Sequence, residues 1–332
     1  MKILFWGGGK GNNGPNNVSN SYRMHLTESF VLVKSHHKYG ELIEAVWKLL
    51  FSDCVVVSGV SRKGVLLVGI ARIFGKKSLF IMHGCAEYEC EINKVKCSRQ
   101  ALAQERYLLK HCTLLLPVSR KFMFWVRERY PRYAYKTQYL HNGIEKDLLP
   151  KGMVISKRPN TVIAAGGNRI QKANDVISEA VESMEGKTTL KIYGGLSRPY
   201  PQDVYRYVKY MGRIPHDQFV EKMAESELLV LNSLFEPFSL AIVEALVCGC
   251  SVLVSEAAGV TDLLALEETD IIHDPMDQNE IRWKIEYLLA HPNNERILAS
   301  LNVEEYSYPR QVQKLERICR ELVEKRCGDR EQ

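Results

Sequence analysis

Residues 228–255, LLVLNSLFEPFSLAIVEALVCGCSVLVS, decide the fold. The stretch opens with an unbroken apolar run at 228–231, which is typical of a strand buried on both faces of a parallel sheet. Pro237 fixes a turn, a helix is expected from about Ser239, and a second apolar strand follows at 251–255. Strand, helix and strand in this order predict a βαβ unit.

Apolar runs of the same kind recur along the chain and alternate with helix-compatible stretches. The expected strands are 2–6, 54–58, 78–83, 112–118, 137–140, 161–165, 189–193, 207–211, 227–232, 251–255 and 270–273. A polar stretch at 145–160 separates two series, so we expect two doubly wound α/β domains, 1–150 and 151–306. Helical periodicity in 309–326 predicts a closing amphipathic helix within 307–332.

The composition is that of an ordinary globular protein. The chain has 332 residues, of which 45% are hydrophobic and 25% charged, and this excludes disordered, collagen-like and disulfide-scaffold proteins. Its nine cysteines are odd in number and several lie in apolar runs, which favours buried thiols in a reducing compartment. A metal site at His83, Cys85, Cys90 and Cys97 is an alternative, although it lacks the close CxxC pairs of structural zinc sites.

Targeting and charge patterns favour a cytoplasmic protein that lies at most on the surface of a membrane. The apolar N-terminus looks like a first strand, not a signal peptide, and no run approaches the roughly 18 apolar residues of a membrane span. Residues 1–150 carry 23 Lys and Arg against 11 Asp and Glu, whereas residues 151–332 carry 22 against 28. We therefore expect the basic N-terminal half to face an anionic membrane surface, the inner leaflet of the cytoplasmic membrane.

The glycine-rich loop at 7–17, GGGKGNNGPNN, follows the first expected strand and contains GxGxxG at 9–14. A dinucleotide site is one interpretation. Against it, Pro15 is expected to keep the chain in a loop, and the next apolar run, 31–33, leads into Lys34 and not into an acid that could bind ribose. A loop that closes over phosphate or acceptor is favoured, and a loop without a ligand remains open.

Two glutamates flank the predicted helix start. Glu236 lies on the loop after the strand, and Glu244 lies eight residues later in the first turns of the helix. Free N–H groups at 238–241 form an anion site that the helix dipole reinforces. Carboxylates beside such a site suit hydroxyl groups, one set from a sugar and one from a ribose. Alternatively, Glu236 is a helix-start acid and Glu244 a solvated helix residue.

This motif resembles that of the retaining glycosyltransferases of family 4, whose pattern is EPFGxxxxEAxxxGxPVxxS and whose fold is GT-B. Further landmarks look similar and occur in the same order: His83-Gly84, Val118-Ser119, Asn142-Gly143, Arg169 with Lys172, and Gly212-Arg213-Ile214-Pro215. The resemblance implies two Rossmann-like domains that face each other across a cleft, with the closing helix crossing back to the N-terminal domain.

The resemblance also implies a role for each matching residue. Glu244 would bind the ribose of a nucleotide-sugar donor, and Glu236 would bind the hydroxyls of its sugar. The other implied donor contacts are the amides of Phe238, Ser239 and Leu240, the cations Arg169 and Lys172, the loop from Gly11 to Gly14, and main-chain groups at Arg213 and Ile214 for the base.

On the N-terminal domain, His83 would face the sugar, and a structural role for this histidine is the alternative. Three features depart from the pattern: Ser239 replaces a glycine, Ser251 replaces a proline, and Arg169 lies closer to Lys172 than in the family. Arg169 could therefore be an ordinary surface arginine.

The implied activity is the transfer of a sugar from a UDP- or GDP-sugar to a glycan hydroxyl, with retention and without a metal. The chain has no Asp-x-Asp to hold a cation, and two basic residues with a helix N-terminus could stabilise the leaving diphosphate instead. The expected acceptor is a lipid-linked or free oligosaccharide in surface polysaccharide, capsule or lipopolysaccharide assembly. Two alternatives are a nucleotide-sugar 2-epimerase on the same fold and a non-catalytic nucleotide-sugar-binding protein.

Residues 120–136 interleave basic and aromatic side chains. A helix whose aromatic stripe packs on the first sheet is one interpretation. An interfacial helix on anionic lipid, with Phe122, Trp125 and Arg129 near the headgroups, is the other. No nucleic-acid partner is expected, because no recognisable reader motif accompanies the segment.

Overall fold

The computed structural model describes residues 1–9, 14–35, 38–149, 155–196 and 204–328. It divides into two compact units. Unit 1 comprises Met1–Cys90, Lys96–Gly143 and Glu304–Gln332, and unit 2 comprises Glu91–Val95 and Ile144–Val303. The main divisions, after residues 143 and 303, fall a few residues before the boundaries at 150 and 306 expected from the sequence.

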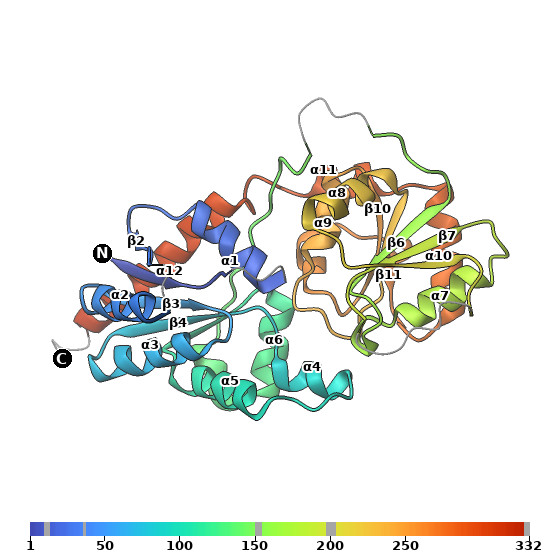
Figure 1. Cartoon of the computed structure of the whole chain (residues 1–332). Helices are drawn as coiled ribbons and strands as arrows, with labels where there is room; N and C mark the ends of the chain where they lie inside the picture. The colour runs from blue at the N-terminus through green and yellow to red at the C-terminus, as the bar shows by residue number, and fades with distance from the viewer. Residues whose placement is uncertain (10–13, 36–37, 150–154, 197–203, 329–332) are drawn as a thin grey trace. The chain divides into compact units, whose positions relative to one another are not determined.

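Unit 1 contains a five-stranded parallel sheet with the order β2-β1-β3-β4-β5 (Figure 1). Its strands are β1 (Ile3–Trp6), β2 (Phe30–Val31), β3 (Cys54–Ser58), β4 (Lys77–Met82) and β5 (Leu114–Pro117). Every residue of β3 and β5 is buried, as expected for strands covered on both faces. Its helices are α1 (Gly14–Met24), α2 (Lys38–Leu50), α3 (Arg62–Ile73), α4 (Ala86–Ile92), α5 (Arg99–His111), α6 (Arg120–Arg129) and α12 (Tyr308–Gly328).

Two local expectations for unit 1 are wrong. Residues 137–140 form no strand, because only Thr137 pairs, in an isolated bridge with Leu115. Pro15 does not keep the chain in a loop either, because α1 begins at Gly14 and includes it. Proline is well suited to the first turn of a helix, where its missing N–H would have had no intrahelical partner. Gly11 lies outside the described residues.

Unit 2 contains a six-stranded parallel sheet with the order β11-β10-β9-β6-β7-β8. Its strands are β6 (Thr161–Ala165), β7 (Thr189–Tyr193), β8 (Val208–Gly212), β9 (Leu228–Leu231), β10 (Ser251–Ser255) and β11 (Ile271–Ile272). Its helices are α7 (Asn174–Glu182), α8 (His216–Glu225), α9 (Leu240–Val247), α10 (Gln278–Ala290) and α11 (Asn294–Ser300). The predicted βαβ unit is therefore β9-α9-β10.

The strand orders define where ligands should bind. In open parallel sheets, ligands bind beyond the carboxyl ends of the strands, at the point where the strand order reverses. This switch point lies between β1 and β3 in unit 1 and between β6 and β9 in unit 2. Side chains that follow these four strands are therefore the first candidates for function.

The closing helix α12 belongs to unit 1, as expected of a helix that crosses back to the N-terminal domain. The ring of Tyr308 packs edge-on against Tyr22 of α1, with centroids 5.4 Å apart. The hydroxyls of Thr27 and Ser29 each donate to the Glu316 carboxylate at 2.7 Å. Aromatic packing and hydrogen bonds thus anchor this helix to α1 and to the segment before β2.

Helix α6 packs its apolar stripe inside unit 1. Phe122 is 2% exposed, which agrees with the interpretation of a packed aromatic stripe and not with the alternative that places this residue at lipid headgroups. Trp125 stacks on Phe122 with ring centroids 5.8 Å apart, and the guanidinium of Arg129 lies 5.8 Å from the ring centre of Tyr88. Phe124, in contrast, is exposed. Within the described residues, no helix is both long and apolar enough to cross a bilayer.

Candidate active site

The carboxyl ends of β6 and β7 form a glycine-lined surface in unit 2. Gly166, Gly167 and Gly194 have φ angles of +93°, +68° and +131°, which side chains with a Cβ rarely adopt. A Cβ on Gly167 would collide with the carbonyl oxygen of Gly195. The two strand ends therefore approach closely, and the half-buried backbone of Gly166 and Gly194 is not covered by side chains of its own.

Lys172 and Glu236 form an ion pair at the switch point of unit 2. Lys172 ends the short 3₁₀ helix Ile170–Lys172 after β6, and Glu236 lies on the loop after β9. The Lys172 ammonium donates to the Glu236 carboxylate and, at 3.3 Å, to the hydroxyl of Ser233. Its stem runs along Gly166, where a Cβ would lie 2.7 Å from Lys172 Cγ. The glycine thus makes room for the buried lysine.

The N-terminus of α9 lies directly after this carboxylate. Ser239, the N-cap residue, has φ +79° and ψ +89°, and its side chain makes no capping hydrogen bond. The carbonyls of Glu236 and Phe238 accept from the N–H groups of Gly259 and Val260 at 2.9 and 2.8 Å, which fixes the loop. The first turn of α9 therefore has no side-chain cap, and its N–H groups can face an anion.

Glu244, the second predicted glutamate, is paired with a histidine that sequence reasoning missed. The Glu244 carboxylate lies 2.9 Å from Nε2 of His216, the first residue of α8. This hydrogen bond is the main reason why the pKa of His216 is raised. No motif signals the pair, because it arises from the packing of α8 against α9.

Of the remaining predicted donor residues, Arg169 and Arg213 lie beside the glycine-lined surface. Arg169 is half-buried and its Nε donates to the carbonyl of Gly166 at 3.3 Å. Arg213 is exposed, and a Cβ on Gly195 would lie 3.1 Å from its Nη2 atom. Ile214 and Leu240 are half-buried, whereas Phe238 is 2% exposed.

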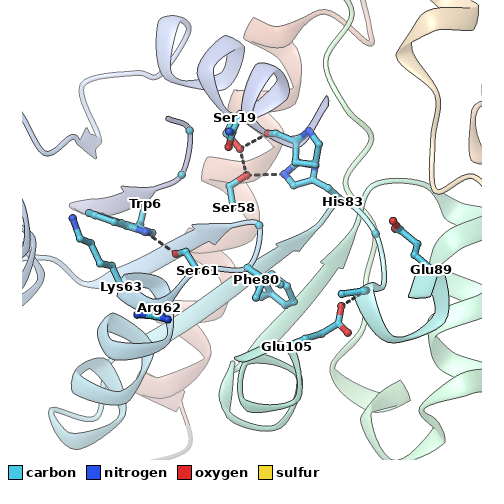
Figure 2. Close-up of a pocket in the computed structure, with 18 residues that line it drawn as sticks. Trp6, Ser19, Ser58, Ser61, Arg62, Lys63, Phe80, His83, Glu89 and Glu105 are labelled. Carbon is cyan, nitrogen blue, oxygen red and sulfur yellow. Dashed lines mark hydrogen bonds between the residues drawn. The ribbon is translucent and has the colours of Figure 1, made fainter. Parts of the chain in front are cut away.

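Unit 1 has a pocket of about 570 Å³ at its own switch point (Figure 2). Trp6 ends β1 and Gly7 follows it, Ser58 ends β3, and His83 follows β4; all four line the pocket. Gly14, the remaining predicted loop residue, begins α1, and an added Cβ there would meet nothing within 4 Å.

A directed hydrogen-bond chain holds His83 in this pocket. Ser19 Oγ donates to the Pro15 carbonyl at 2.8 Å, so it must accept from Ser58 Oγ, which lies 2.8 Å away. Ser58 in turn accepts from His83 Nε2 at 2.8 Å, which places the imidazole proton on Nε2. Burial lowers the pKa of His83 to about 4, so this histidine is neutral near pH 7.

Glu89 is a second pocket residue that the sequence did not reveal. Its carboxylate lies close to Gly84: a Cβ added to that glycine would collide with Oε1 of Glu89. Figure 2 shows Glu89 on the same side of the pocket as His83. The pocket therefore presents carboxylate, imidazole and hydroxyl groups, which is the chemistry that binds sugar hydroxyls.

No three His, Cys, Asp or Glu side chains of the described residues gather where they could hold a metal ion. The Cys85 thiol lies 3.3 Å from the Tyr130 hydroxyl, and that of Cys97 donates to the Ala86 carbonyl at 3.5 Å.

Comparison with protein families gives a match in the second half of the chain. Residues 146–300 match the family described as Glycosyl transferases group 1. Two uncharacterized glycosyltransferases of Methanocaldococcus jannaschii are each 21% identical, over 176 and 188 residues, or 47% and 52% of this chain. These alignments span only 45% and 53% of the two relatives.

Solved structures match both units. Anabaena HepE, solved with UDP and glucose, is 15% identical and has a TM-score of 0.67, over 96% of this chain and 99% of HepE. A Rickettsia africae glycosyltransferase is 14% identical with a TM-score of 0.68, over 97% and 98% of the two chains. WaaG, a glycosyltransferase of lipopolysaccharide biosynthesis, is 16% identical with a TM-score of 0.59, over 97% and 98%. The chain therefore has the GT-B fold, and its residues 146–300 match the glycosyl transferases group 1 family.

Proposed function

We propose that the protein is a retaining glycosyltransferase of family 4 that moves a sugar from a nucleotide-sugar donor to a hydroxyl of a glycan, without a metal. The observation that carries this proposal is the ion pair between buried Lys172 and half-buried Glu236 at the switch point of unit 2, beside the uncapped N-terminus of α9. A cation and a helix N-terminus suit a diphosphate, and a carboxylate suits sugar hydroxyls.

In this proposal, the donor binds with its diphosphate at the first turn of α9, with Lys172 and Arg169 supplying positive charge. Glu236 accepts hydrogen bonds from the sugar, and Glu244 accepts them from the ribose. The solved complexes of HepE with UDP and UDP-glucose support a UDP-sugar as donor, with a GDP-sugar as the alternative.

The chemistry is a front-face displacement. The acceptor oxygen forms a bond to the anomeric carbon on the face from which the diphosphate leaves, while the bond from that carbon to the phosphate oxygen breaks. The acceptor proton passes to the leaving phosphate oxygen. Lys172, Arg169 and the helix N-terminus stabilise the charge that develops on the diphosphate.

We further propose that the pocket of unit 1 binds the acceptor. His83, Ser58 and Glu89 line it and can bind hydroxyl groups. The similarity to WaaG, a glycosyltransferase involved in lipopolysaccharide biosynthesis, and the basic charge of residues 1–150 support a lipid-linked or oligosaccharide acceptor. Such an acceptor would belong to surface polysaccharide, capsule or lipopolysaccharide assembly. The protein would act from the cytoplasm, at the inner face of the membrane.

The test is incubation with UDP-, GDP- and ADP-sugars, with and without glycan acceptors, while nucleotide release is measured. A transferase releases nucleotide and extends the acceptor, a 2-epimerase changes the sugar without an acceptor, and a binding protein does neither. Glu236→Gln and Lys172→Ala should each lower turnover at least about tenfold, since each removes a charged contact to the donor. The exposed Lys187 provides the control, Lys187→Ala, and EDTA should leave turnover unchanged. Full activity of Lys172→Ala would refute the assignment.

A further inference from the structure

Unit 1 has a second pocket, distinct from the one that contains His83. It has a volume of about 490 Å³ and lies between the segment 139–141 and the start of α12. Its lining residues are Tyr139, His141, Glu305, Tyr306, Arg310, Gln311, Gln313, Lys314 and Arg317. None of them takes part in the proposed sugar transfer.

The pocket is rich in positive charge. Arg310, Lys314 and Arg317 are spaced by four and three residues, so they share one face of α12. Glu305 is the single acidic side chain among the lining residues. Burial, followed by the charge of Arg317, lowers the pKa of Lys314. The charge of Arg317 thus affects Lys314 more than the opposing charge of Glu305 does.

The bonds of these cations within the described part of the chain leave room for an anion. Arg310 donates to Gln313 at 3.2 Å, and the Lys314 ammonium lies 5.1 Å from the ring centre of Tyr139. Arg317 has an exposed carboxylate partner, Glu321, at 3.9 Å. Arg310 and Lys314, together with Arg317, whose exposed carboxylate partner is 3.9 Å away, therefore suit a phosphate group.

Gln311 supplies a second, independent observation. It is 3% exposed and its Nε2 donates to the carbonyl of Glu305 at 3.1 Å. Its Oε1 atom is buried and has no hydrogen-bond partner among the described residues. A buried acceptor of this kind is costly unless a donor satisfies it, and a ligand hydroxyl is such a donor.

We propose that this pocket binds a phosphate group carried by a hydroxyl-bearing headgroup. The phosphate binds to Arg310, Lys314 and Arg317, and a neighbouring hydroxyl donates to Gln311, with the rings of Tyr139 and Tyr306 as walls. The same chemistry occurs in a free polyol phosphate and in the headgroup of an anionic phospholipid. The site is independent of the donor site on unit 2, so it stands even if the proposed transferase activity does not.

The experiment measures binding of glycerol 3-phosphate and inorganic phosphate by calorimetry, and of vesicles of phosphatidylcholine with or without phosphatidylglycerol by co-sedimentation. Excess UDP is present to occupy the donor site. We expect glycerol 3-phosphate to bind more tightly than inorganic phosphate, because only the former brings hydroxyls to Gln311. Vesicle binding that requires phosphatidylglycerol and weakens with salt identifies the lipid headgroup as the source. Binding of glycerol 3-phosphate without vesicle binding identifies a free polyol phosphate.

Variants on one helix provide the matched comparison. Arg310→Gln combined with Lys314→Gln should weaken binding of the responding probe at least about tenfold, since two charge-assisted contacts are lost. Lys314→Arg keeps the charge and should retain binding. Arg320→Gln removes a cation of α12 that does not line the pocket, and it should bind as the unaltered protein does. An absence of binding to every probe at low salt, or an equal loss in Arg320→Gln, overturns the proposal.

Discussion

Replacing Ser239 with glycine tests the geometry of the proposed donor site directly. The backbone of Ser239 has φ +79° and ψ +89°, and its hydroxyl makes no capping bond to α9. A non-glycine residue at positive φ costs about 1–3 kcal/mol. The glycosyltransferase family 4 pattern that this segment resembles has glycine at this position, and the positive φ of Ser239 is a physical reason for such a preference.

The expected change in stability follows from two opposing terms. Ser239→Gly removes the backbone strain, about 1–3 kcal/mol, and adds about 0.5–1 kcal/mol of entropy to the unfolded chain. No capping bond is lost, so we expect the free energy of unfolding to rise by about 1 kcal/mol. Ser239→Ala keeps the Cβ and the strain, and it should be neutral or slightly destabilising.

Urea unfolding of the three proteins provides the measurement, with equal slopes required for the comparison. A fall in the unfolding free energy of Ser239→Gly, or an equal gain in Ser239→Ala, would refute the strain argument. The donor KM gives a second readout, because the smaller residue opens space where the backbone is proposed to meet the sugar. An unchanged donor KM together with a higher free energy of unfolding would show that Ser239 affects the stability of the fold and not donor binding.

Two further predictions concern pH and the glycine-lined surface. Burial lowers the pKa of His83 to about 4, whereas an unfolded histidine titrates near pH 6.5. Between these values the unfolded chain binds more protons than the folded one, so the free energy of unfolding should fall as the pH falls through this window. In His83→Gln, urea unfolding at pH 7 and pH 5 should show a smaller difference than in the unaltered protein; an equal difference would contradict the reasoning. Gly167→Ala should lower the free energy of unfolding by about 1–3 kcal/mol more than Gly212→Ala, because both have positive φ but only the first would place a Cβ against a backbone carbonyl. Equal losses in the two glycine variants would show that the close approach of the strands is unimportant.

The sequence predicted the fold wherever a segment is buried on both faces. Residues 54–58, 161–165 and 251–255 form strands with the expected bounds, because β-branched and aliphatic runs have few other stable environments. Residues 189–193 also have the expected bounds, although Thr189 is exposed and Lys191 is half-buried. Residues 137–140 carry a similar pattern, but the 3₁₀ helix Pro131–Lys136 leads to a single bridge at Thr137. The sequence pattern of one segment does not show over how many residues it pairs with a neighbouring strand.

The candidate site likewise contains some residues that the sequence predicted and others that it did not. Lys172 and Glu236 follow strands that flank the switch point, so a motif and a strand order together suffice to bring them near each other. Glu89, His216 and Ser58 were missed because their positions depend on how helices pack and on which hydroxyls lie beside a buried imidazole. The His216–Glu244 and Ser58–His83 contacts join residues 28 and 25 positions apart, so no single segment encodes them.

In the proposed function, donor binding must change the contact between Lys172 and Glu236. The two side chains neutralise each other, so the pair by itself attracts no anion, and the net charge available to a diphosphate comes from Arg169 and the N-terminus of α9. For Lys172 to stabilise a bound diphosphate fully, the diphosphate must draw the Lys172 ammonium away from Glu236. The Glu236 carboxylate can then accept hydrogen bonds from sugar hydroxyls. Glu236→Gln removes the competitor for Lys172, so it should bind UDP more tightly, by about three- to tenfold, even while it slows turnover. Calorimetry with UDP measures this directly, and Glu244→Gln, which leaves the pair intact, is the comparison. Weaker UDP binding by Glu236→Gln would show that Glu236 holds Lys172 in place for the diphosphate and does not compete with it.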